Sequence, residues 1–210
     1  MSFSNGVKRS RAMVVAAGWL AGAWLVGHGA ASAQTAVTTI GSTDARICYE
    51  EANSPYGSAV ERCDIALSRD DLSRRDRRAT LVNRGIIRNR IGQYELAIAD
   101  FNEALDGADE LGEALLNRGN SRYLQKAYAD AIVDYRAALA SDFGKPEVCW
   151  YNIGLAEKAS GNVAAARTAF IQATAAAPNF QPAREQLADL NAAAAGVAGT
   201  GPVVEDGDAQ

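Results

Sequence analysis

The chain has 210 residues, a formal net charge of −4 and one histidine, His28. This length suffices for one domain with a substantial core, and the acidic balance argues against general nucleic-acid binding. His28 lies in a segment that we expect to be removed, so the remaining chain excludes Ser-His-Asp and Cys-His catalysis and zinc sites with imidazole ligands.

Residues 1–33 have the pattern of a secretory signal peptide. A basic start at residues 8–11 precedes an apolar run over residues 12–26, and Ala31-Ser32-Ala33 follows as an Ala-x-Ala cleavage site. The alternative, an uncleaved membrane anchor, is disfavoured because the run is short for a bilayer span and glycines interrupt it. We expect export without membrane insertion after cleavage, to the periplasm if the source is a Gram-negative bacterium.

The segments at the two ends of the remaining chain are polar or small. Residues 34–43 are predicted to be a flexible linker. Residues 194–210 combine Gly, Ala and acidic residues and lack the apolar surface needed to fold, so they are predicted to be a disordered acidic tail.

Capping residues predict the helix boundaries between these ends. Ser54 followed by Pro55 is expected to start a helix, and Ser73 with Asp76 resembles a capping box. Glycines fall where helices should end, at Gly92, Gly144 and Gly161. The helices are predicted near residues 44–52, 55–68, 74–90, 94–106, 110–126, 128–141, 146–160, 163–176 and 182–193. No stretch alternates with a strand period, so the fold class is all-α.

One set of residues returns three times at nearly constant spacing. Its occurrences are Asn83, Gly85, Ala97, Phe101 and Ala104; Asn117, Gly119, Ala131, Tyr135 and Ala138; and Asn152, Gly154, Ala166, Phe170 and Ala173. The step between occurrences is about 34 residues, a period that is typical of a helix–turn–helix solenoid. We expect the small residues to lie where paired helices approach closely, and the aromatic rings to fill the space between successive pairs.

The three segments LVNRG, LLNRG and WYNIG, with their continuations, resemble the tetratricopeptide repeat (TPR). Trp150 matches the signature tryptophan of the third repeat, and Pro178 matches its terminal proline. The resemblance implies a TPR-type solenoid with three clear repeats over residues 78–180 and a C-terminal cap helix over residues 181–193.

A degenerate N-terminal repeat and its connector are predicted over residues 44–77. Within it, Cys63 corresponds to Phe101, and its neighbours echo the second helix of the first clear repeat. Cys48 and Cys63 lie on its two predicted helices, and in an oxidising compartment we expect them to form a disulfide, with Cys149 left as a buried thiol. The alternative is that all three cysteines are small core residues.

Arginines recur beside an acidic residue in two repeats. Arg84, Arg88 and Asp100 return one repeat later as Arg118, Arg122 and Asp134. The third repeat has lost both kinds of residue, with Ile153, Glu157 and Ala169 in their places. Because a partly buried charge needs a partner, we predict ion pairs within each of the first two repeats; the alternative is a pair of exposed, duplicated charges.

The resemblance also implies that an extended peptide binds on the concave surface formed by the first helix of each pair. In several peptide-binding TPR families an asparagine holds the peptide backbone there, and Asn83, Asn117 and Asn152 match it. A carboxamide donates and accepts hydrogen bonds at once, as a peptide unit requires. Further lining residues are predicted to include Ile86, Asn120 and Tyr151. The alternative is that these asparagines bond only to neighbouring helices.

These observations favour a non-catalytic scaffold of the bacterial cell envelope that binds a protein or peptide. The alternative is a self-associating structural component of the envelope. We expect no enzyme activity and no cofactor, since no metal cluster, phosphate-binding loop or nucleophile motif is present. The stretch Arg69–Arg90 has eight arginines and three aspartates, so it could attract an acidic partner or anionic head groups.

Overall fold

The computed structural model describes residues 43–69, 71–108, 111–141 and 144–198. The predicted signal peptide, most of the linker and the end of the tail lie outside these residues. The described part is built of helices without a strand, as predicted: α1 (Thr43–Asn53), α2 (Glu61–Leu67), α3 (Arg74–Arg90), α4 (Tyr94–Leu105), α5 (Gly112–Leu124), α6 (Tyr128–Ala140), α7 (Pro146–Ala159), α8 (Val163–Ala176) and α9 (Gln181–Ala198).

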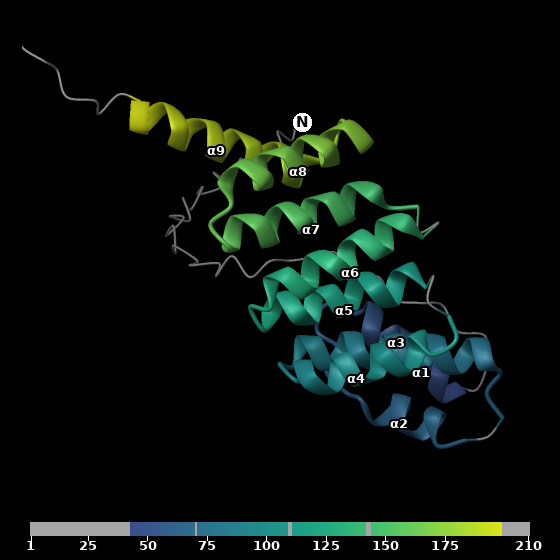
Figure 1. The fold of residues 1–210 in the computed structure, drawn as a ribbon. Coiled ribbons are helices and arrows are strands. Elements are labelled where there is room, and N and C mark those ends of the chain that lie inside the picture. The colour runs from purple at the N-terminus through teal and green to yellow at the C-terminus, as the bar shows by residue number, and fades with distance from the viewer. Residues whose placement is uncertain (1–42, 70, 109–110, 142–143, 199–210) are drawn as a thin grey trace, which may run out of the picture.

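These helices form a stack of antiparallel pairs (Figure 1). The pairs are α1 with α2, α3 with α4, α5 with α6 and α7 with α8, and α9 packs on α8. The second helix of each pair contacts the first helix of the next, and the first helices α3, α5 and α7 also contact one another in order. The fold is therefore the predicted all-α solenoid.

Two helix boundaries differ from the prediction. Ser54 and Pro55 do not start a helix; the Gly57 amide donates to the Ser54 carbonyl in a turn, and α2 begins at Glu61. At the other end, α9 continues to Ala198 rather than ending at residue 193, so residues 194–198 are helical and not disordered. The alanine-rich sequence explains this extension, because alanine has the highest helix propensity.

The predicted capping box at the start of α3 is present. The Ser73 hydroxyl oxygen accepts a hydrogen bond from the Asp76 amide at 3.1 Å, and the Ser73 hydroxyl donates to the Asp76 carboxylate at 2.8 Å. This cap fixes where the first clear repeat begins.

Each repeat glycine lies beneath the aromatic ring of its own pair. A Cβ atom added at Gly85 would come within 2.6 Å of the Phe101 ring, and one at Gly119 would come within 2.6 Å of Tyr135. Gly154 faces Phe170 in the same way. Glycine is needed because the two helices meet there without room for a side chain. Each ring therefore contacts the glycine of its own pair. That the rings also fill the space between successive pairs stays a prediction.

The N-terminal pair is joined covalently. Cys48 of α1 and Cys63 of α2 form a disulfide with their Cα atoms 4.9 Å apart, and Cys149 is a buried free thiol. Both features agree with the sequence prediction.

The predicted ion pairs are present in both repeats. Arg84 and Arg88 contact Asp100 at 2.6 and 2.7 Å, and Arg118 and Arg122 contact Asp134 at 2.7 and 2.8 Å. Both carboxylates are buried. Loss of hydration raises the pKa of Asp100 above its ordinary value, although the two arginines oppose this shift.

The same arginines connect one pair to the next. Arg84 also contacts Asp64 of α2 at 2.7 Å, and Arg118 donates to Asn102 of α4 at 2.8 Å. Asp64 and Asn102 hold equivalent positions, because each directly follows the corresponding residue of its pair, Cys63 or Phe101. The N-terminal pair is therefore stacked in the same register as the later ones.

Candidate functional site

The first helices α3, α5 and α7 form one side of the stack, which we call the inner side. The sequence-predicted asparagines Asn83, Asn117 and Asn152 lie at equivalent places on these three helices, and all are buried at 1% exposure or less. The structure therefore brings them into one row. Their role in holding a peptide stays a prediction.

The other predicted lining residues divide into two groups. Ile86 and Asn120 are buried along the same row, whereas Tyr151 is only partly buried. The Tyr151 ring contacts the rings of Phe170 and Phe180, with centroids 5.8 and 5.5 Å apart. Tyr151 thus belongs to the apolar contact between α7, α8 and the segment before α9.

Side-chain hydrogen bonds connect the row across neighbouring helices. The Asn152 amide donates to Asn120 Oδ1 at 3.1 Å, and the Tyr135 hydroxyl donates to the same oxygen at 3.0 Å. This network joins α5, α6 and α7. Packing between repeats therefore accounts for part of the asparagine pattern, as the structural alternative predicted.

The network leaves two of its amide atoms without a hydrogen bond. Asn120 Nδ2, a donor, and Asn152 Oδ1, an acceptor, are buried and have no partner in the part of the chain that the structure describes. An unpaired buried polar group costs about 1–3 kcal/mol. Both atoms are closed off from solvent, so this unsatisfied contact lies between the packed helices and not on an open surface.

A cavity of about 420 Å³ adjoins this end of the inner side. Its walls come from α5, α7 and α9, and the lining residues are Tyr123, Leu155, Lys158, Ala159, Gln186 and Asp189. Lys158 donates to Gln186 at 2.7 Å across it. Burial raises the pKa of Tyr123, so its phenol stays neutral at physiological pH. We call this cavity the inner pocket.

Sequence reasoning predicted the row and placed Leu155 on the same surface, but it missed the rest of the inner pocket. Lys158 follows Asn152 by about two helical turns, so helical periodicity could have found it. Gln186 and Asp189 could not be found in this way, because their approach depends on how α9 packs on α8.

Most arginines of the Arg69–Arg90 stretch have internal partners. Arg69 contacts Asp44 at 3.3 Å, and Arg90 donates to the backbone carbonyls of Glu51 and Ala52 at the end of α1. Only Arg74 and Arg75 have no hydrogen bond or ion pair within the described residues. The stretch is therefore mainly structural, with two side chains left for other contacts.

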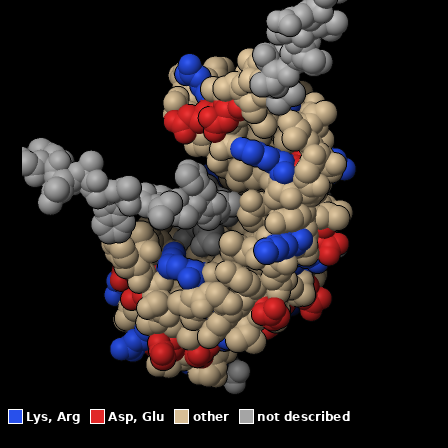
Figure 2. Space-filling model, turned by 90° about the vertical axis from the view of Figure 1, so that its left-hand side faces the viewer, with Lys and Arg blue, Asp and Glu red and all other residues tan. Residues whose placement is uncertain are grey.

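The face shown in Figure 2 is hollowed, and basic and acidic side chains are interspersed over it. No broad basic surface of the kind that binds nucleic acid lies on that face. Among the described residues, no three or more His, Cys, Asp or Glu side chains are grouped to hold a metal ion, and no helix has the length and apolar character to cross a bilayer.

Comparison with known proteins agrees with the fold. Residues 148–180 match the family model for the tetratricopeptide repeat. No match is found among curated proteins.

Several solved structures are similar. MamA from Desulfovibrio magneticus RS-1 has a TM-score of 0.58 at 17% identity, covering 74% of this chain and 88% of that one. The Sgt2 TPR domain from Aspergillus fumigatus has a TM-score of 0.55 at 21% identity, covering 64% and 90%. The second TPR domain of human RPAP3, in complex with an HSP70 peptide, has a TM-score of 0.52 at 19% identity, covering 57% and 98%.

Proposed function

Because this chain is a tetratricopeptide-repeat protein, we propose that it is a non-catalytic scaffold that binds an extended protein segment along its inner side. TPR domains in general are protein-interaction modules. The human RPAP3 domain, which shares this fold, was solved with a peptide bound. That likeness supports a protein or peptide as the class of partner.

The observation that carries the proposal is the inner pocket at the end of the row. The pocket offers about 420 Å³ with the apolar surfaces of Tyr123, Leu155 and Ala159, enough for a large side chain. The buried amide atoms Asn120 Nδ2 and Asn152 Oδ1 take no part in this binding, because the surface of the row closes over them. A pocket for one side chain beside the first helices is a feature by which a surface can hold an extended segment.

We place this activity in the bacterial cell envelope. The signal-peptide pattern of residues 1–33 supports export, and the Cys48–Cys63 disulfide is of the kind that persists in an oxidising compartment. A fusion of residues 1–40 to alkaline phosphatase tests this part, since that enzyme is active only after export. An inactive fusion would remove the envelope from the proposal and leave the binding role intact.

Filling the inner pocket tests the binding role. Ala159 is exposed at the end of α7, so Ala159→Phe places a ring in the pocket without changing the core. Ala99→Phe, on an exposed position of α4, is the matched control. Proteins captured from an envelope extract by the wild type and by the control should be lost with Ala159→Phe. Equal capture by all three chains would overturn the proposal.

The alternative, self-association within the envelope, is favoured by apolar side chains on the second helices. Leu96, Val133 and Ile171, on α4, α6 and α8, are 49%, 63% and 48% exposed. Light scattering after size-exclusion chromatography separates the two functions. A monomer that captures partners supports the scaffold, and a concentration-dependent oligomer that dissociates on Val133→Ser supports self-association.

A further inference from the structure

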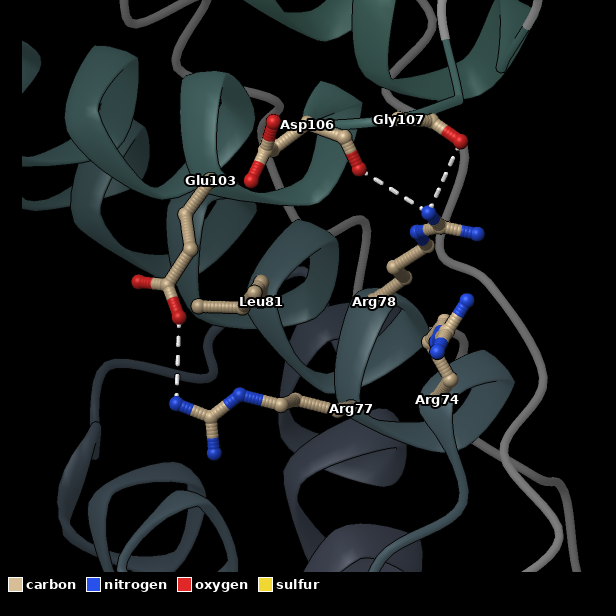
Figure 3. A pocket seen from close by; sticks show the side chains of 7 residues that line it. All are labelled: Arg74, Arg77, Arg78, Leu81, Glu103, Asp106 and Gly107. Carbon is tan, nitrogen blue, oxygen red and sulfur yellow. Dashed lines mark hydrogen bonds and ion pairs between the residues drawn. The ribbon is translucent and has the colours of Figure 1, made fainter.

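A second cavity, of about 410 Å³, lies away from the inner pocket, between the first turns of α3 and the end of α4 (Figure 3). Its lining residues are Arg74, Arg77, Arg78, Leu81, Glu103, Asp106 and Gly107. Three arginines from two adjacent turns of one helix therefore face a single cavity.

The charges in this cavity are separated. Arg77 points to Glu103 at one end, and the two are 3.1 Å apart. Arg74 and Arg78 lie at the other end, where the Arg78 guanidinium turns toward the backbone oxygens of Asp106 and Gly107, and the Asp106 carboxylate points away from both arginines (Figure 3). One end is thus neutralised internally, while at the other end neither Arg74 nor Arg78 forms an ion pair with a described carboxylate.

Arg78 is held in place by backbone. Its Nη2 donates to the carbonyls of Asp106 and Gly107 at 2.9 and 3.0 Å. These neutral carbonyls orient the guanidinium but cancel none of its charge. The remaining guanidinium nitrogens of Arg78, and all those of Arg74, make no hydrogen bond within the described residues. The site depends on these side chains and not on the helix start, whose amide is already capped by Ser73.

The basic surface continues over the other side of Arg78. There Arg78 and Arg75 line a cavity of about 340 Å³ whose other walls are Ala79, Ala108, Leu111 and Glu113. Arg75 also has no partner within the described residues. We call Arg74, Arg75 and Arg78 the arginine shelf. Two adjacent cavities with three guanidinium groups suit neighbouring carboxylates on one chain better than a single small anion, because each guanidinium can bind a carboxylate with two donors.

We propose that the arginine shelf binds the side-chain carboxylates of an acidic protein segment. The inference rests on the proposed scaffold function, because the segment is part of the partner held on the inner side. Ala79 of α3 and Glu113 of α5 line the second cavity, so the shelf borders two of the inner-side helices. The shelf then selects acidic partners for a chain whose own net charge is −4.

Fluorescence anisotropy with labelled hexaglutamate tests the shelf directly in the full chain. Arg74→Gln/Arg75→Gln removes two exposed side chains that hold no internal contact. The control, Arg46→Gln/Arg136→Gln, removes the same charge at exposed positions on α1 and α6. We expect the shelf variant to raise the Kd for hexaglutamate at least tenfold and the control to change it less than twofold. Wild-type binding should weaken as salt is added.

Three results would overturn the proposal. These are equal binding by the shelf variant and the control, equal binding of hexaglutamine and hexaglutamate, and displacement of the labelled peptide by inorganic phosphate as readily as by unlabelled hexaglutamate. Failure of the scaffold function is a separate result. If that function alone is wrong, Ala159→Phe captures the same proteins as the wild type while hexaglutamate still depends on the shelf.

Discussion

The N-terminal pair and the three pairs after it differ in what holds their two helices together at one equivalent position. In α3–α4, Phe101 lies on Gly85, and the ring fills the space between the helices. In α1–α2, Cys63 stands where the phenylalanine would be, and a disulfide to Cys48 joins the helices instead. A covalent bond replaces a ring-on-glycine contact at one position of the repeat.

The difference shows what each pair needs. The later pairs have second helices of 12 to 14 residues, whereas α2 has 7 and buries only Cys63 and Ala66. So short a helix cannot bury enough apolar surface to hold its position by packing alone. A crosslink instead reduces the conformational entropy of the unfolded chain, and so it stabilises a pair that has a small core.

Removing the Phe101 ring should lower the stability of the chain more than any other change proposed here. Phe101→Ala deletes a fully buried side chain and leaves a cavity over Gly85, so we expect the free energy of unfolding to fall by about 3–5 kcal/mol. Urea denaturation followed by circular dichroism measures this. A loss below about 1 kcal/mol would mean that the junction is not held by the ring.

Removing the crosslink should cost less and act locally. For a loop of about 15 residues, Cys48→Ser/Cys63→Ser should lower stability by roughly 3 kcal/mol. Hydrogen exchange should become faster in α1 and α2 and stay unchanged in α7 and α8, which do not contact them. Uniformly faster exchange would contradict the view that the disulfide supports only the N-terminal pair.

The third cysteine, Cys149, is a free thiol, so a thiol count distinguishes it from the two bridged cysteines. Thiol counting on unfolded, unreduced protein should find one thiol, Cys149, and a count of three would exclude the bridge. Burial raises the pKa of the Cys149 thiol to about 12, whereas in the unfolded chain it ionises near about 8.5.

The sign of the resulting pH dependence follows from this raised pKa. Below about pH 8.5 both states keep the proton, and above it the unfolded state alone loses it, so the free energy of unfolding falls by about 1.4 kcal/mol per pH unit. Stability curves between about pH 8.5 and 10 should be steeper for the wild type than for Cys149→Ala. Parallel curves would contradict the buried, protonated thiol.

The smallest effect concerns the turn between paired helices. Gly92 and Gly161 end the first helices of two repeats with φ of 80° and 85°, and Lys126 holds the equivalent place in the second repeat with φ of 63°. A left-handed lysine is strained. Lys126→Gly should therefore stabilise the chain by up to about 1 kcal/mol, measured by thermal unfolding, and a loss of stability would refute this explanation.

Contacts between residues that are close in sequence, or that recur from repeat to repeat, could be predicted from the sequence. Ser73 and Asp76 predicted the start of α3 because a capping box is local. Asp100 and Asp134 were matched with their arginines because the repeats provide an internal comparison. The start of α2 was missed because the Ser54 turn competes with proline's preference for a helix start.

Contacts without an internal counterpart could not be predicted. Arg90 donates to carbonyls at the end of α1, and Arg78 to those after α4; a sequence does not mark such acceptors. The burial of Asn83 and Asn117 depends on the packing of successive first helices. The inner pocket depends on α9, whose full length was itself underestimated.

Site-specific photo-crosslinking tests the central claim, binding along the inner side, most directly. A photoreactive phenylalanine analogue is placed at residue 159, in the inner pocket, or at residue 99, on the outside of α4, in the full chain. The account predicts partner adducts from residue 159 and none from residue 99. Adducts from residue 99 with none from residue 159 would contradict it.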